Sequence, residues 1–135
     1  MITNMENSIK DEIKKKYSKI VVSGNDDCCC MPGECDSGDS PIDATKLIGY
    51  DQKELESIPQ EAILGVGCGA PINHTQLKEG ETVVDLGSGA GIDIFLAARK
   101  VLDSRKAIGI DMTDDMLKKA RENAKKELSN VEFKK

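Results

Sequence analysis

The chain has 135 residues, and its 24 acidic side chains outnumber its 19 lysines and arginines, which gives a net charge of -5. This length allows one modest domain, and the acidic balance argues against a nucleic-acid backbone as the main partner. No apolar run approaches the roughly twenty residues that cross a bilayer, and residues 1–16 lack the apolar core of a signal peptide. We therefore expect a cytoplasmic protein that binds neither membrane nor nucleic acid.

Helical patterns dominate the amino-terminal part of the chain. Residues 4–21 predict an amphipathic helix, because apolar side chains recur along one side and charged side chains, mostly lysines, cover the other. Residues 43–58 predict one or two short helices, and Pro59 ends this helical run. We expect these helices to belong to a region, residues 1–79, that precedes the sheet-forming residues 80–135.

Two loops carry the five cysteines of the chain. Residues 24–43 are rich in glycine, proline, aspartate and serine, which leave little to bury. This loop holds Cys28, Cys29, Cys30 and Cys35. Residues 61–71 form the second loop, in which alternating glycines flank Cys68 and leave its thiol poorly covered. In an intracellular chain such thiols are expected to be reactive or metal-binding rather than disulfide-bonded.

The stretch from Val83 to Met112 predicts a strand, a glycine-rich turn, a helix and a second strand. Each strand is a short apolar run that ends on an acid, Asp85 in the first and Asp111 in the second. A right-handed crossover makes two such strands parallel neighbours. The two acids and the turn are then expected to meet at the carboxyl ends of the strands.

Each glycine of the turn has a physical reason to be there. Gly87 lets the chain leave the strand sharply, Gly89 removes a side chain where a ligand would approach, and Gly91 lets the helix start close to the sheet. The unpaired amides of the first helical turn favour a carboxylate or phosphate. Asp111 lies twenty residues after Gly91, where a carboxylate can accept hydrogen bonds from both hydroxyls of a ribose. Together these features predict a nucleoside site.

Two alternative interpretations of the turn carry less weight. The dinucleotide fingerprint places its third glycine three residues after the second, at the position of Ile92, whereas this chain has it one residue earlier. That spacing disfavours a nicotinamide oxidoreductase. An ordinary tight turn with a structural aspartate would not explain the strand before it, the helix after it and the acid at the end of the next strand.

A further helix and strand follow Asp111. Residues 113–128 predict a helix with one apolar stripe, and residues 131–133 start a third strand. Three parallel strands in the order 3-2-1 form half of a doubly wound sheet, and the first strand, at residues 83–86, would be an exposed edge despite its apolar side chains. We therefore expect a fragment of a longer enzyme, with marginal stability or self-association through that edge.

The run Asp85-x-Gly87-x-Gly89-x-Gly91 resembles motif I of the class I S-adenosylmethionine-dependent methyltransferases. The resemblance implies an α/β fold, namely the amino-terminal half of a Rossmann-like methyltransferase sheet preceded by a helical, cysteine-containing region. It also implies S-adenosylmethionine as the cofactor. The acid at Asp85 would help hold its methionine end, the acid at Asp111 would take the ribose, and Met112 would lie against adenine. The implied cofactor-binding residues of the turn itself are Gly87, Ser88, Gly89 and Gly91.

Within that superfamily the chain is similar to the arsenite methyltransferases. The resemblance runs from about Tyr17 to Ala124, with its stronger motifs in the second half. Its segments include Gly49-Tyr50, Leu64-Gly65-Val66-Gly67-Cys68-Gly69-Ala70-Pro71, Gly80–Asp93 with Phe95–Ala98, and motifs within Gly109–Ala124. In that family cysteine thiolates hold trivalent arsenic, and the arsenic lone pair attacks the methyl group of the cofactor. One family cysteine matches Cys68, and another matches one of the four upstream cysteines. The resemblance thus implies catalytic thiols at Cys68, Cys29 and Cys30, with Cys28 and Cys35 as further candidate arsenic ligands beside Cys68.

The implied activity is methyl transfer to arsenite, with arsenite or its thiol conjugates as substrate and a thiol reductant as partner. Two further arsenic-binding cysteines of the family lie beyond the cofactor motifs, so we expect this chain alone to turn over poorly or not at all. One alternative is a class I methyltransferase for another small molecule. Another is a non-enzymatic zinc module, although the adjacent cysteines lack the two-residue gaps of structural zinc sites.

Overall fold

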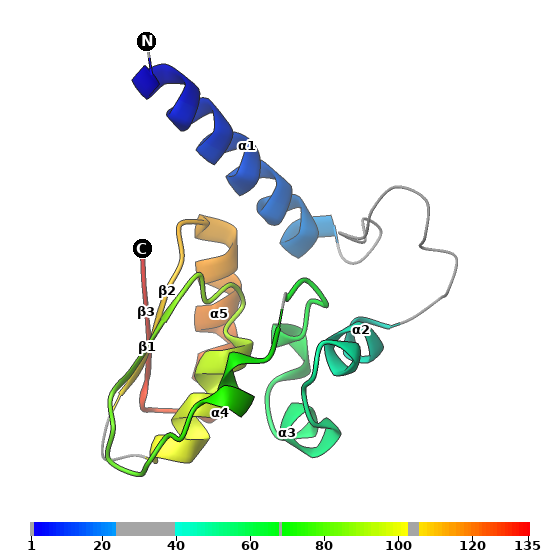
Figure 1. The fold of residues 1–135 in the computed structure, drawn as a ribbon, viewed down its shortest axis with the longest axis vertical. Helices are drawn as coiled ribbons and strands as arrows, with labels where there is room; N and C mark the ends of the chain where they lie inside the picture. The colour runs from blue at the N-terminus through cyan, green and yellow to red at the C-terminus, as the bar shows by residue number, and fades with distance from the viewer. Residues whose placement is uncertain (1, 24–39, 68, 103–105) are drawn as a thin grey trace.

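The computed structural model describes residues 2–23, 40–67, 69–102 and 106–135, and Figure 1 shows how they are arranged. The centre of the fold is a sheet of three parallel strands. They are β1 (Val83–Leu86), β2 (Ala107–Ile110) and β3 (Val131–Lys134), in that spatial order. The predicted three-stranded parallel sheet is therefore confirmed, with the predicted order.

The register of the sheet brings the two predicted acids to the same edge. Val83 pairs with Ala107 and Leu86 pairs with Ile110, so β1 and β2 end side by side. The glycine turn follows the end of β1, and Asp111 follows the end of β2. Because the strands are parallel, both segments lie at the carboxyl edge of the sheet.

Two crossover helices connect the strands and cover one face of the sheet. Helix α4 (Ile92–Val101) joins β1 to β2, and α5 (Asp114–Glu127) joins β2 to β3. In Figure 1 both helices lie on the same side of the strands. Their apolar residues are buried there, among them Ile94, Phe95, Leu96, Ala97, Ala98, Val101, Met116, Leu117 and Ala120. The rings of Phe95 and Phe133 meet edge to face with centroids 5.9 Å apart.

Strand β1 is an edge of the described sheet, as predicted. Its side chains alternate in burial, and Val84 and Leu86 are 55% and 78% exposed. These two apolar residues point away from α4, because successive side chains of a strand point to opposite faces. Within the described residues that face of β1 therefore remains open.

The region after residue 40 forms two short α-helices, in line with the one or two predicted for residues 43–58, and the first begins at Pro41. Ser40 caps α2 (Pro41–Leu47), and its hydroxyl accepts a hydrogen bond from the amide of Asp43. Asp51 caps α3 (Gln52–Glu56) in the same way. Two short 3-10 helices follow, at Gln60–Ala62 and Pro71–His74. Tyr50, Leu55, Ile58 and Ile72 from this region share one hydrophobic cluster with Ile94 and Phe95 of α4.

The predicted helix over residues 4–21 is present as α1 (Ile2–Ser23), which extends beyond these bounds. Of its apolar stripe only Ile20 is buried, whereas Ile9, Ile13 and Tyr17 are 54%, 39% and 38% exposed. The reason is visible in Figure 1, where most of α1 projects away from the sheet. In the described part of the chain, no helix combines the length and the apolar character needed to cross a membrane.

Candidate functional site

The glycine turn is fastened to the end of β2 by its own backbone. The amides of Gly87 and Ser88 both donate to the carbonyl oxygen of Ile110, at 2.7 and 3.0 Å. The amide of Gly91 donates to the carbonyl of Ser88 at 2.9 Å. Gly87, Gly89 and Gly91 have φ values of 83°, 53° and 99°, in the left-handed region that favours glycine. The turn therefore has a defined backbone conformation that its hydrogen bonds hold in place.

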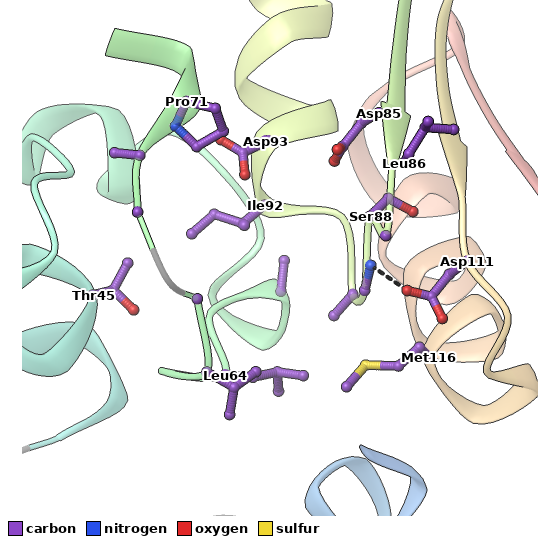
Figure 2. Close-up of a pocket in the computed structure, with 18 of the residues that line it drawn as sticks. Thr45, Leu64, Pro71, Asp85, Leu86, Ser88, Ile92, Asp93, Asp111 and Met116 are labelled. Carbon is purple, nitrogen blue, oxygen red and sulfur yellow. Dashed lines mark hydrogen bonds between the residues drawn. The ribbon is translucent and has the colours of Figure 1, made fainter. Parts of the chain in front are cut away.

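Asp111 lies at the mouth of this turn, as the sequence predicts. Its Oδ2 accepts a hydrogen bond from the amide of Gly89 at 2.9 Å, which Figure 2 marks with a dashed line. Its Oδ1 accepts from the amide of Thr113 at 2.8 Å. Each carboxylate oxygen has two lone pairs, so Asp111 keeps acceptor capacity for a ligand while it holds the turn. The sequence did not predict this second role, although an aspartate that accepts from the amide two residues on is a common turn pattern.

Gly91 is required by packing as well as by backbone angle. A Cβ at this position would lie 2.8 Å from Cζ of Phe133 and 2.9 Å from Cε2 of Phe95. At Gly87, by contrast, a Cβ would meet no atom within 4 Å, and at Gly89 only the sulfur of Met116 at 3.9 Å. Gly91 thus lets α4 approach the sheet, while the two earlier glycines leave the backbone open to a ligand.

The hydroxyl of Ser88 is buried beneath the turn. Ser88 is 5% exposed, and its Oγ has no hydrogen-bond partner among the described residues. A Cβ on Gly109 would lie 2.7 Å from this oxygen, so the hydroxyl packs against β2. A ligand in front of the turn would therefore meet its backbone rather than the Ser88 side chain.

A pocket of about 950 Å³ opens in front of the turn. One side is formed by the turn, Asp111, Met112 and Met116, and the opposite side by the short helices and the glycine-rich loop after them. In Figure 2, Asp85 and Asp93 lie toward the end near Pro71, while Leu64 and Met116 lie at the other end. Such a volume suits a small organic molecule.

The pocket carries negative charge. Asp85, Asp93 and Asp111 line it, and its described lining contains no lysine or arginine. Burial raises the pKa of Asp93 to about 6; the charge of Asp85 adds to this rise, and a hydrogen bond from Tyr50 opposes it. Burial also raises the pKa of Asp85, with a further contribution from the charge of Asp111. A positively charged ligand would reduce the electrostatic repulsion among these carboxylates.

Asp93 and Tyr50 form a contact for which the sequence predicted no role. The Tyr50 hydroxyl donates to Oδ2 of Asp93 at 2.8 Å, across 43 positions of sequence. The other carboxylate oxygen, Oδ1, is buried and has no partner among the described residues. Asp93 was visible as the acid in the first turn of a helix, but no local pattern predicts that Tyr50 would reach it.

The predicted thiol site can be compared with the structure only through its neighbours. Cys28, Cys29, Cys30, Cys35 and Cys68 all lie outside the described residues. Gly67 and Gly69, which flank position 68 in the sequence, both line the pocket. In Figure 2 the labelled residues Leu64 and Pro71 of this loop lie across the pocket from Ser88 and Asp111. No group of three or more potential metal ligands occurs in the described ranges.

The groups that face the pocket fit a cationic nucleoside. Two open glycine positions leave room for a ligand against the backbone, and Asp111 has spare lone pairs for hydroxyl groups. The unpartnered Oδ1 of Asp93 is a buried acceptor that lacks a donor among the described residues. Met112 and Met116 supply adaptable apolar surface for a flat ring.

The chain is similar in sequence to known proteins. Residues 77–135 match a family model described as a methyltransferase domain. An arsenite methyltransferase of Halobacterium salinarum is 42% identical over 132 residues, covering 92% of this chain and 34% of that protein. The ribosomal protein L11 methyltransferase of Neisseria gonorrhoeae is 39% identical over 59 residues, covering 44% of this chain and 19% of that protein. The chain thus spans about a third of the length of the first relative and about a fifth of the second.

A solved structure is also similar over most of the chain. It is that of an arsenic(III) S-adenosylmethionine methyltransferase from Chlamydomonas reinhardtii, with 28% sequence identity and a TM-score of 0.45. The match covers 72% of this chain and 32% of that one.

Proposed function

We propose that this chain belongs to the class I S-adenosylmethionine-dependent methyltransferases and is part of an enzyme that methylates trivalent arsenic; the matches to a methyltransferase domain and to an arsenite methyltransferase support this. One observation carries the proposal: the glycine turn and Asp111 face, across a single pocket, the loop whose Gly67 and Gly69 flank Cys68 in the sequence. A nucleoside site and a thiol-bearing loop then border the same space.

S-adenosylmethionine is the cofactor in this proposal. When bound, it supplies an electrophilic methyl group carried on a positively charged sulfur. The turn residues Gly87, Ser88, Gly89 and Gly91 bind it through their backbone, and Asp111 takes the ribose hydroxyls. Asp85 holds the methionine end and Met112 lies beside adenine.

The residues of the pocket favour a positive charge. The carboxylates of Asp85 and Asp93 stabilise a cation in the pocket because no lysine or arginine of the described lining offsets them. Leu64, Ile92 and Met116 give the pocket apolar walls, which strengthen these electrostatic interactions. The chain thereby orients a cationic ligand without a covalent bond to it.

The substrate is trivalent arsenic bound by cysteine thiolates. Arsenic(III) is thiophilic, and thiolates are the binding form of cysteine. Cys68 is the central ligand, with Cys29 and Cys30 as further catalytic thiols and Cys28 and Cys35 as alternative arsenic ligands. A thiol reductant keeps these cysteines reduced, and the cytoplasm supplies such conditions. Methylation of arsenite in this setting serves detoxification.

In this proposal the two regions of the chain have different roles. Residues 1–79 carry all five cysteines and so supply the arsenic ligands. Residues 80–135 carry the glycine turn and Asp111 and so supply the first part of the cofactor site. The match to the arsenite methyltransferase includes the first region, whereas the match to the ribosomal protein methyltransferase covers only 59 residues. This difference supports arsenite as the substrate over a ribosomal protein.

Protection of thiols from alkylation tests the proposal. The reduced chain is treated with iodoacetamide with and without arsenite, and modification of each cysteine is measured by mass spectrometry. We expect arsenite to protect Cys68 and at least one upstream cysteine, and we expect Cys68→Ser to abolish the protection of the others. Unchanged alkylation of Cys68 at saturating arsenite would refute arsenic binding, and one equivalent of zinc in the purified protein would favour a metal module instead.

A further inference from the structure

The contact between Tyr50 and Asp93 joins two parts of the pocket that are far apart in the sequence. Tyr50 lies between α2 and α3, directly after Gly49, while Asp93 lies in the first turn of α4. Both residues line the pocket. Their hydrogen bond of 2.8 Å therefore links the helical region to the element that begins at the glycine turn.

Tyr50 is held in this position from its backbone as well. Gly49 has a φ of 109°, which turns the chain sharply after α2. Nδ2 of Asn73 donates to the carbonyl of Gly49 at 2.6 Å, and the amide of Gly49 donates to the carbonyl of Lys46 at 3.0 Å. Tyr50 is only 5% exposed, so its ring is packed while its hydroxyl reaches Asp93.

We propose that Asp93 is a positioning residue: it holds the Tyr50 hydroxyl and thereby fixes the wall of the pocket opposite Asp111 for ligand binding. This inference rests on the proposed cofactor site. The carboxylate acts through Tyr50, and its Oδ1 remains free of any partner in the described residues. A hydrogen bond between a hydroxyl and a carboxylate is among the stronger single contacts in a protein, which suits it to this task.

A positioning role predicts how the single and double variants of Tyr50 and Asp93 bind the ligand. Tyr50→Phe removes the donor and Asp93→Ala removes the acceptor, so both break the same bond. Once the bond is absent, removing the second partner has nothing more to break, and the double variant should resemble each single one. Asp93→Asn keeps an acceptor oxygen for the Tyr50 hydroxyl and should restore binding.

Calorimetric titration of the 135-residue chain with S-adenosylhomocysteine measures these effects. We expect Tyr50→Phe and Asp93→Ala each to raise the Kd roughly tenfold, the double variant to raise it by the same factor, and Asp93→Asn to stay within about threefold of the wild type. The matched control is Asp114→Ala, which removes an aspartate from the first turn of α5 outside the pocket lining. Circular dichroism of each variant separates a binding loss from failure to fold.

The outcomes separate this inference from the proposed function. A wild-type chain that does not bind S-adenosylhomocysteine would overturn the cofactor site and the positioning role with it. Binding by the wild type that survives Tyr50→Phe unchanged would overturn the positioning role alone. If Asp93→Asn weakens binding of S-adenosylhomocysteine, which carries no sulfonium charge, as much as Asp93→Ala does, the hydrogen bond to Tyr50 does not set this affinity, and the positioning role is wrong. If Asp93→Ala does not fold, Tyr50→Phe and Asp93→Asn still decide the question.

Discussion

Replacing Asp93 by asparagine is expected to stabilise the protein at neutral pH. Burial raises the pKa of Asp93 from 3.8 to about 6, so the folded state holds this proton more tightly than the unfolded state does. The stability that the protonated carboxyl provides is fully present below pH 3.8 and is lost as the pH rises through about 6. Ionised Asp93 therefore destabilises the folded state at neutral pH. Asparagine cannot ionise and so avoids this destabilisation.

The size of this effect follows from the shift. A difference of about two pKa units corresponds to about 3 kcal/mol for a fully buried group. Asp93 is half-buried and lines an open pocket, so solvent screening reduces this to about 1–2 kcal/mol. For a chain of 135 residues the gain corresponds to a rise in Tm of about 5 °C.

Thermal unfolding of the two proteins between about pH 4 and pH 8 measures the difference. We expect Asp93→Asn to be more stable at the upper end of this range, with the two curves converging at the lower end, where Asp93 is protonated in the folded state. Asp114→Ala is the control, because Asp114 lies outside the pocket lining. Equal stabilities at the upper end, or a gain that persists unchanged at the lower end, would show that the charge of Asp93 is not destabilising.

Three further changes test other parts of the site. Gly91→Ala places a Cβ 2.8 Å from Phe133 at a φ of 99°. It should lower the free energy of unfolding in urea by about 2–5 kcal/mol. The control Gly69→Ala adds a Cβ that meets no atom within 4 Å and should lower this free energy by less than about 0.5 kcal/mol. Asp111→Asn turns an amide donor toward a backbone amide and should cost about 1–3 kcal/mol by the same measurement, with wild-type stability contradicting the role of Asp111 as an anchor of the turn. Asp93→Asn should weaken binding of S-adenosylmethionine about threefold more than binding of S-adenosylhomocysteine, since only the former carries a sulfonium charge that a carboxylate attracts; equal losses in calorimetry would show that the carboxylate does not sense this charge.

Local patterns were sufficient to predict the strands and the crossover. Two apolar runs, at residues 83–86 and 107–110, indicate strands, and the spacing between them indicates a helix. Two strands joined by a helix in this way form a parallel pair with a right-handed connection. This arrangement brings Asp111 to the glycine turn, and the hydrogen bond to Gly89 confirms it. The requirement for glycine at position 91 followed from the same argument, and Phe133 supplies the physical reason.

Contacts that depend on tertiary packing were not predictable from local patterns. Nothing near Tyr50 indicates that its hydroxyl would reach Asp93, because the partners are 43 residues apart and join only when two regions share a core. The same limit applies to α1, because its apolar stripe predicted an amphipathic helix but could not predict that Ile9 and Ile13 are exposed. The roles of the five cysteines stay predictions.

The central claim is that the glycine turn and Asp111 together form a nucleoside site. The most direct measurement is a titration of the isotope-labelled chain with S-adenosylhomocysteine, followed through the backbone amide resonances. We predict saturable shifts at Gly87, Gly89 and Gly91 and at Asp111, with little change in the first turns of α1. Resonances of the turn that do not move at saturating ligand, or shifts confined to another part of the molecule, would contradict it.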